Sequence, residues 1–210
     1  MKYSDFPIVK PTAKSIAFRK LVYGVGINDA DYMVQPYDSD GKQLRCPIYR
    51  FWNHMFERCY DPLWHAKYPT YESCTVDERW HSFMAFREWV LAQPEWEGLE
   101  LDKDLLFPGN KMYGPDTCLF VSRQVNQFIT SCTKSVGRYP IGVSPSGSGG
   151  KWIARVGAGS NGARWYSGRV DTMERAVELY YAKRRELALE LASKQTDPRI
   201  ALALITQFSK

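Results

Sequence analysis

The sequence predicts an α+β protein. A two-stranded hairpin with a short helix, braced by other helices, is followed by a three-stranded antiparallel sheet packed on one helix. Two observations carry this prediction. Residues 99–126 have the pattern of strand, polar loop, strand and helix, and residues 138–194 have the pattern of three strands and a long helix. We therefore expect four parts: an N-terminal extension 1–44, a first domain 45–135, a second domain 138–194 and a tail helix within 195–210.

The hairpin is predicted from alternation and from turn residues. Residues 99–104 alternate apolar and polar side chains, as a half-buried strand does, and end in a charge cluster. Glycine, proline and asparagine residues then interrupt regular structure before the short apolar run 118–121, which suits a second, buried strand. Ser122 suits the N-cap of a helix from Arg123 to about Cys132. An ordinary surface hairpin stays open as an interpretation of this segment.

This order of elements, with Asp102 on the first strand and Asn126 on the helix, resembles the HNH (ββα-metal) endonucleases, in particular phage-type, homing-endonuclease-like members. The resemblance implies metal-assisted hydrolysis of duplex DNA, with Asp102 and Asn126 binding Mg²⁺ or Mn²⁺. Two positions depart from the family pattern. Lys103 stands at the position of the general-base histidine, and Thr117 at that of the asparagine that orients it. Either a coordinated change of mechanism or decay of catalysis would explain both departures.

The sequence therefore leaves two candidates for the general base. Lys103 could serve if burial beside a metal disfavours its charged form, and His81 could approach the site and replace the missing histidine. The helical patterns at 48–60 and 79–93 are expected to brace the hairpin. The candidate catalytic residues are Lys103, Asp104, Thr117 and His81.

The second domain begins with three predicted strands. They cover residues 139–144, 150–156 and 163–168, which carry alternating or β-branched and aromatic residues. Asn161 and Gly162 predict a tight hairpin turn between the last two strands, since both residue types tolerate positive φ angles. Side chains on each strand should alternate between a face under a helix and an outward face.

A long helix follows the third strand. Asp171 is predicted to cap it, with Glu174 three residues later as in a capping box. Strand, strand, strand, helix in this length, with GKWIARV and a helix beginning DTMERAVELYY, resembles the AP2-type DNA-binding domain of plant transcription factors and phage endonucleases. That resemblance implies that the outward face of the sheet enters a DNA major groove. A helical stripe is expected to lie on the sheet: Ala176, Leu179, Tyr180, Lys183, Leu187 and Leu191.

Charge supports the same interpretation. Residues 138–194 contain ten Lys and Arg against five Asp and Glu, and this excess equals the net charge of +5 of the whole chain. Such a local basic excess is typical of phosphate recognition, although a basic, solvated sheet face without a ligand stays open. Ser144 and Ser146 stand where the AP2 family has arginines, so the target sequence is not predicted. The candidate DNA-binding residues are Ser144, Ser146, Lys151, Arg155, Arg164 and Tyr166.

Composition limits the classes of protein. With 44% hydrophobic residues the chain can form a core, and no apolar run approaches the roughly 20 residues of a membrane helix, so we expect a cytoplasmic protein, in a host cell if phage-encoded. The five cysteines lack CxxC spacing and suit buried thiols, although a zinc site assembled from distant cysteines stays open. The expected partner is double-stranded DNA. Two functions remain: a DNA endonuclease, or an inactive DNA-binding regulator or architectural protein that keeps the HNH fold.

Overall fold

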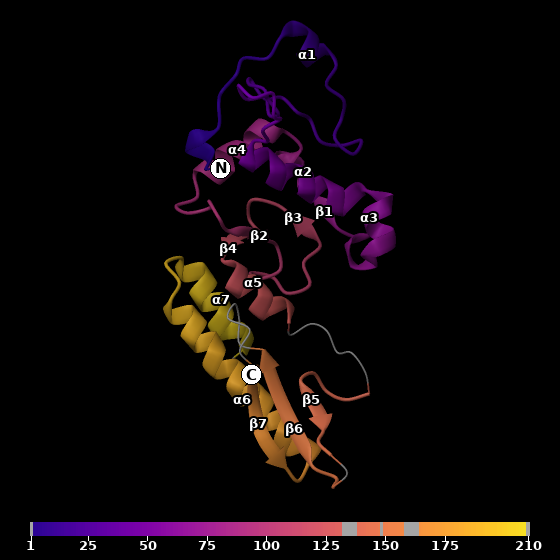
Figure 1. The fold of residues 1–210 in the computed structure, drawn as a ribbon, viewed down its shortest axis with the longest axis vertical. Helices are drawn as coiled ribbons and strands as arrows, with labels where there is room; N and C mark the ends of the chain where they lie inside the picture. The colour runs from indigo at the N-terminus through magenta and orange to yellow at the C-terminus, as the bar shows by residue number, and fades with distance from the viewer. Residues whose placement is uncertain (1, 132–137, 148, 158–163, 209–210) are drawn as a thin grey trace. The chain divides into compact units, whose positions relative to one another are not determined.

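The protein is a mixed α+β structure (Figure 1). A computed structural model describes residues 2–131, 138–147, 149–157 and 164–208. The chain divides into two compact units, residues 1–120 and 121–210. The domain boundaries expected from the sequence stay predictions. None of the helices in the described residues combines the length and the apolar character that a membrane span requires.

The first unit holds four helices and a set of very short strands. Its helices are α1 (Ala13–Ala17), α2 (Pro47–Tyr60), α3 (Pro62–Lys67) and α4 (Phe83–Leu91). Its strands are β1 (Thr75–Val76), β2 (Glu100–Asp102), β3 (Met112–Tyr113) and β4 (Leu119–Val121), the last ending at the boundary of the unit. Single 3₁₀ turns lie at Tyr3–Asp5, Pro69–Tyr71 and Glu78–Trp80.

The two predicted bracing helices exist, with one corrected start. Pro47 occupies the first turn of α2, where its missing N–H costs nothing. The second helix was expected from Arg79, but a 3₁₀ turn covers Glu78–Trp80 and α4 begins only at Phe83. The reason is local: Ser82 is the N-cap, and its hydroxyl accepts a hydrogen bond from the Ala85 N–H at 3.1 Å.

Aromatic side chains from both helices build the core of the first unit. Trp52, Phe56 and Phe83 are fully buried, and their rings pack at centroid distances of 4.7 Å and 5.6 Å around Trp52. The Trp52 indole N–H donates to the Trp80 carbonyl oxygen at 2.8 Å, so burying this large ring leaves no unsatisfied donor. This core supports the short strands that carry the predicted metal ligand Asp102.

The segment expected as an N-terminal extension, residues 1–44, supplies part of this core. Phe6 and Tyr32 are buried in it. Asp29 accepts a hydrogen bond from the Met84 N–H at 2.9 Å, in the first turn of α4, where a carboxylate is favourable. The segment is therefore part of the folded unit rather than an appendage to it.

The predicted hairpin is present in outline. The structure pairs β2 with β4, and β2 is shorter than the strand expected over 99–104. The loop between them was expected to lack regular structure, but it contains β3, which pairs in parallel with β1: Thr75 lies opposite Met112 and Val76 opposite Tyr113. Local sequence could not predict this pairing because the partner strand lies far away along the chain.

The second unit begins with α5 (Arg123–Thr130) and continues with β5 (Val143–Pro145), β6 (Trp152–Gly157), β7 (Arg164–Val170), α6 (Met173–Ser193) and α7 (Pro198–Phe208). The three strands form the predicted antiparallel sheet, in the order β5-β6-β7, and β5 begins at Val143 in place of Tyr139. Helix α6 covers one face of this sheet, and α7 runs beside α6 (Figure 1). The apolar core between the sheet and α6 consists of Val143, Ala154, Val156, Ala176 and Tyr180.

Some details of this unit differ from the prediction or lie outside what is described. The N-cap of α6 is Thr172, whose hydroxyl accepts from the Arg175 N–H at 3.1 Å, so the predicted Asp171 cap is wrong by one residue. The predicted turn at Asn161 and Gly162 lies outside the described residues. Helix α5 ends at Thr130, two residues before the end expected near Cys132. Ser122 is confirmed as the N-cap of α5.

Candidate functional site

Asp102 ends β2 and organises the turn that follows it. Its carboxylate oxygen Oδ1 accepts hydrogen bonds from two backbone N–H groups, Asp104 at 2.9 Å and Leu105 at 2.7 Å. The residue is only 9% exposed, and burial raises the pKa of its carboxyl above the ordinary value. Within the described residues these bonds engage Oδ1 and leave Oδ2 open. That second oxygen suits a hard cation, whose charge would offset the burial of the carboxylate.

Lys103 is buried beside it, with 6% of its surface exposed. Its Nζ donates to the Asp104 carboxylate at 2.7 Å and to the Asn110 carbonyl oxygen at 2.6 Å, and it lies 5.7 Å from the centre of the Tyr113 ring. A general base must accept a proton, whereas this amine acts as a donor to two acceptors. The geometry therefore favours a structural role for Lys103, which ties the charged end of β2 to the loop.

Asn110 completes this loop and was missed as a candidate. Its side-chain amide donates to the Lys103 and Met112 carbonyl oxygens at 2.9 Å and 2.7 Å, and its Oδ1 accepts from the Met112 N–H at 3.1 Å. Thr117 Oγ1 donates to the same Met112 carbonyl at 2.8 Å. The Gly109-Asn110 pair was the available signal, since asparagine side chains commonly satisfy turn backbone.

His81 does not join this group of residues. Its Nε2 lies 3.2 Å from the Val76 carbonyl oxygen, at the end of β1. Within the described residues, no hydrogen bond, ion pair or ring contact joins His81 to Asp102, Lys103 or Thr117. The structure therefore gives His81 no connection to the candidate site.

Asn126 lies on α5, in the second unit, whereas Asp102 lies in the first. Their predicted sharing of one metal ion thus stays a prediction. Among the described residues, no three His, Cys, Asp or Glu side chains gather as a metal-binding group. Cys46, Cys59, Cys74 and Cys118 are buried and unpaired, as expected for thiols, and Cys132 lies outside the described residues.

The sheet of the second unit presents basic and aromatic side chains on the face opposite α6. Arg155 on β6 lies directly across from Tyr166 on β7, and both are exposed. Trp165, the neighbour of Tyr166, points the other way and lies 5.9 Å from the Lys183 ammonium on α6. The alternation predicted for Arg155, Tyr166 and Trp165 is confirmed.

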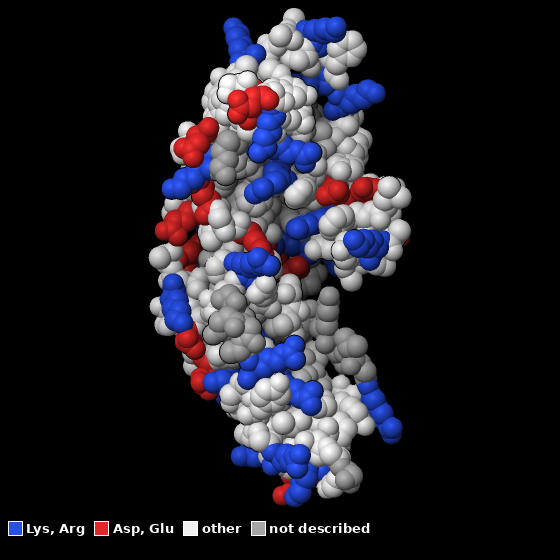
Figure 2. All heavy atoms as spheres, viewed as in Figure 1, with Lys and Arg blue, Asp and Glu red and all other residues white. Residues whose placement is uncertain are grey.

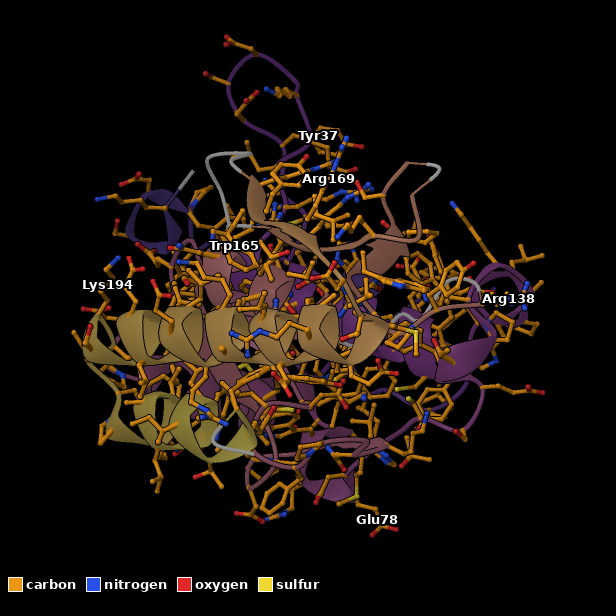
Figure 3. All side chains as sticks on the ribbon, turned by 90° about the horizontal axis from the view of Figure 1, so that it is seen from below. Tyr37, Glu78, Arg138, Trp165, Arg169 and Lys194 are labelled. Atoms are coloured by element: carbon orange, nitrogen blue, oxygen red, sulfur yellow. The ribbon has the colours of Figure 1, made fainter. Side chains whose placement is uncertain are left out.

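A β-bulge adds Arg169 to this outward face. Between the pairs Arg155–Tyr166 and Ile153–Arg169, β6 advances by two residues and β7 by three, so β7 carries one extra residue. Strict alternation from Tyr166 would place Arg169 under the helix. Figure 3 shows Arg169 on the side of the sheet away from α6, and Trp165 between sheet and helix. Gly168, with φ at +77°, was the signal for the bulge.

The other predicted DNA-binding residues differ in availability. Arg164 is exposed at the end of β7, opposite Gly157. The Lys151 ammonium forms an ion pair with Asp171, both of them well exposed, so this pair is weak and open to exchange for a phosphate. Ser144 Oγ is buried without a hydrogen-bond partner among the described residues, and Ser146 is half-buried. The two serines are therefore less accessible than the arginines.

Ion pairing separates the basic residues of this unit into two groups. On α6, three of them pair with glutamates at 2.5–2.7 Å: Arg175 with Glu178, Lys183 with Glu186 and Lys194 with Glu190. Arg155, Arg164 and Arg169 form no ion pair within the described part of the chain. Figure 2 shows Lys and Arg side chains gathered over the β6–β7 end of this unit, with few acids beside them. Arg155, Arg164 and Arg169 thus place uncompensated positive charge on the sheet.

Comparison of this chain with models of protein families, with curated proteins and with solved structures finds no match. The functional assignment therefore depends on the residues and their geometry. Two features stand out among the described residues: the Asp102 turn of the first unit and the basic outward face of the second.

Proposed function

We propose that this protein binds duplex DNA through the outward face of β5-β6-β7 and cuts it with an HNH-like metal site. One observation carries the binding half: Arg155 and Arg169 lie on one face with Tyr166, exposed and without acidic partners in the described residues. Arginine forks bind phosphates and guanine edges, and a strand pair fits the major groove. The AP2-like docking mode belongs to this proposal.

The cleaving half depends on Asp102. Its carboxylate is held in a fixed orientation by two backbone N–H groups while its second oxygen stays available, as a preorganised metal ligand requires. In this proposal Asp102 and Asn126 hold Mg²⁺ or Mn²⁺, which stabilises the leaving 3′-oxygen and the charge on the scissile phosphate. Asp104, half-exposed beside Asp102, offers a further carboxylate to water or metal.

A second candidate is a DNA-binding regulator or architectural protein without catalysis. Specific contacts favour it: Lys103 donates to two acceptors, and Thr117 donates to the Met112 carbonyl, so neither residue is set to take a proton from water. Both candidates share the same DNA-binding face. They differ only in whether metal-dependent cuts occur.

The test is incubation of the pure full chain with supercoiled plasmid and with phage genomic DNA, with and without Mg²⁺ or Mn²⁺. Metal-dependent conversion to open-circular or linear DNA would support the endonuclease. Binding in a mobility-shift assay without any cut under either metal would favour the regulator. Absence of binding at low salt would overturn both candidates.

Arginine substitutions test the proposed binding face. Arg155→Ala and Arg169→Ala should each weaken binding to duplex DNA by about 1–3 kcal/mol if the side chain makes a bidentate base contact. A phosphate contact would instead weaken binding to all sequences alike and lower the salt slope by about one unit. Fluorescence anisotropy over a salt series measures both quantities.

Arg175→Ala is the matched control, because Arg175 is exposed on α6 of the same unit but paired with Glu178. It should change affinity far less than the two sheet variants. Equal losses for all three variants would show that net charge alone, and no defined face, attracts the DNA.

A stability measurement tests the role assigned to Lys103. Lys103→Met should lower the free energy of unfolding by about 1–3 kcal/mol, since the partly buried Asn110 carbonyl loses its donor. Lys111→Met, in the same loop, removes only an exposed bond to the Thr70 carbonyl and should cost under about 0.5 kcal/mol. Urea denaturation compares them, and equal stabilities would contradict the structural role of Lys103.

A further inference from the structure

Arg184 is a buried cation in the second unit. It lies on α6 among residues that otherwise form an apolar stripe, and only 2% of its surface is exposed. From sequence alone, Arg184 is one of the ten Lys and Arg residues in 138–194 that could bind phosphate. Burial removes it from that role, so its charge must serve something inside the unit.

Its hydrogen bonds run to one helix. The Arg184 guanidinium donates through Nη2 to the Phe128 carbonyl oxygen at 2.7 Å and through Nη1 to Ser131 Oγ at 3.0 Å. Both acceptors lie at the C-terminal end of α5, where carbonyl groups lack partners within the helix and the helix dipole favours a positive charge. Arg184 of α6 thus binds the C-terminal end of α5.

Two aromatic rings hold the same guanidinium. It lies 3.7 Å from the centre of the Phe128 ring and 5.2 Å from that of Phe208 on α7, and the two rings pack at 4.9 Å. Contact with ring faces stabilises a cation that has lost its water. Burial lowers the pKa of Arg184 to about 10, which still leaves it charged at neutral pH. Three helices therefore meet at this one side chain.

Helix α5 is also the helix that carries Asn126, two residues before Phe128. The next turn is closed by the Thr130 hydroxyl, which donates to the Asn126 carbonyl oxygen at 2.9 Å. A helix of only two turns is marginal by itself, so tertiary contacts must hold it in place. The contacts of Arg184 supply such a hold from α6.

We infer that Arg184 is a positioning residue for Asn126: it fixes α5 to α6 and α7, so that the predicted metal-binding helix belongs to the DNA-binding module. This inference rests on the proposed function for the role of Asn126. The anchoring contacts stand independently of it. An arginine suits this place because its planar fork reaches both acceptors from two nitrogens, whereas a lysine has only one nitrogen to place between them.

Amide hydrogen exchange on the full chain tests the anchor directly. Arg184→Met should raise exchange of the α5 amides by about 10-fold or more, as expected for loss of a charged hydrogen bond, while the β6 amides stay near wild type. The NMR signals of the Asn126 side-chain amide should shift as well, and Arg184→Lys should restore part of both effects. Arg175→Met, the same change on the exposed side of α6, is the control and should leave α5 unchanged.

Cleavage kinetics add a second readout. Arg184→Met should lower kcat for metal-dependent cleavage with little change in DNA affinity, and should have almost no further effect in an Asn126→Ala background. Wild-type protein that never cuts DNA would contradict the nuclease half of the proposed function only, because exchange and the Asn126 signals still decide the anchor. Unchanged α5 exchange and unchanged Asn126 signals in Arg184→Met would overturn the inference.

Discussion

Replacing Asp102 with asparagine should reduce metal-dependent DNA cleavage by about 10²–10⁴-fold, because a neutral amide cannot neutralise a divalent cation as a carboxylate does. The fold should survive. Asparagine Oδ1 can still accept the N–H groups of Asp104 and Leu105, which alanine cannot. Single-turnover cleavage with Mg²⁺ and with Mn²⁺ measures the effect, and circular dichroism checks the fold.

Asp116→Asn provides the matched control. Asp116 is an exposed acid of the same loop and pairs with Arg79, with a 75% exposed side chain. Its replacement should leave cleavage within about twofold, since exposed pairs contribute little. Wild-type rates in Asp102→Asn would remove this carboxylate from the mechanism. Equal losses in both variants would point to a general electrostatic effect on DNA approach.

Gly142→Ala should destabilise the second unit by about 3–5 kcal/mol, the largest stability effect we expect from a single methyl group. Gly142 has φ at +71°, and a Cβ there would clash with the Tyr180 ring and lie 2.7 Å from the Arg155 carbonyl oxygen. Its own carbonyl accepts the Arg155 N–H at 2.7 Å, so any shift would disturb the strand that carries the proposed DNA contact. Urea denaturation followed by tryptophan fluorescence measures the loss.

Gly147→Ala separates the clash from the backbone strain. Gly147 has a similar φ of +76°, but nothing lies within 4 Å of the added Cβ. It should cost only about 1–2 kcal/mol, the penalty of the left-handed conformation. If the two variants lose equal stability, the clash with the Tyr180 ring makes no contribution to the destabilisation by Gly142→Ala.

Local sequence predicted the elements whose signals are local. The prediction of Ser122 as the N-cap of α5 required only a short polar residue in front of a helical apolar pattern. The prediction that Arg155 faces away from buried Ala154 and Val156 required only the two-residue repeat of a strand. The cap of α6 moved by one residue, from Asp171 to Thr172, because adjacent residues of similar capping strength cannot be ranked from sequence.

The candidate site was predicted less completely. Asp102 was chosen from its place at a strand end, and the structure adds that one of its oxygens is held by two backbone N–H groups. The burial of Lys103 against the Asn110 carbonyl was not predicted, because a lysine in a charge cluster looks solvent-exposed in sequence.

By itself the sequence determined the α+β class, the three strands and long helix of the second unit and the concentration of basic residues there, all of which follow from periodicity and composition. Only the tertiary structure decided which of those charges are available: a bulge turned Arg169 outward, and packing against Phe128 and Phe208 buried Arg184. The pairing of β1 with β3 was likewise decided there. Gly168 marks a bulge locally, but the residues that meet across the sheet, at Arg184 and between β1 and β3 are distant along the chain, and local propensity does not identify them.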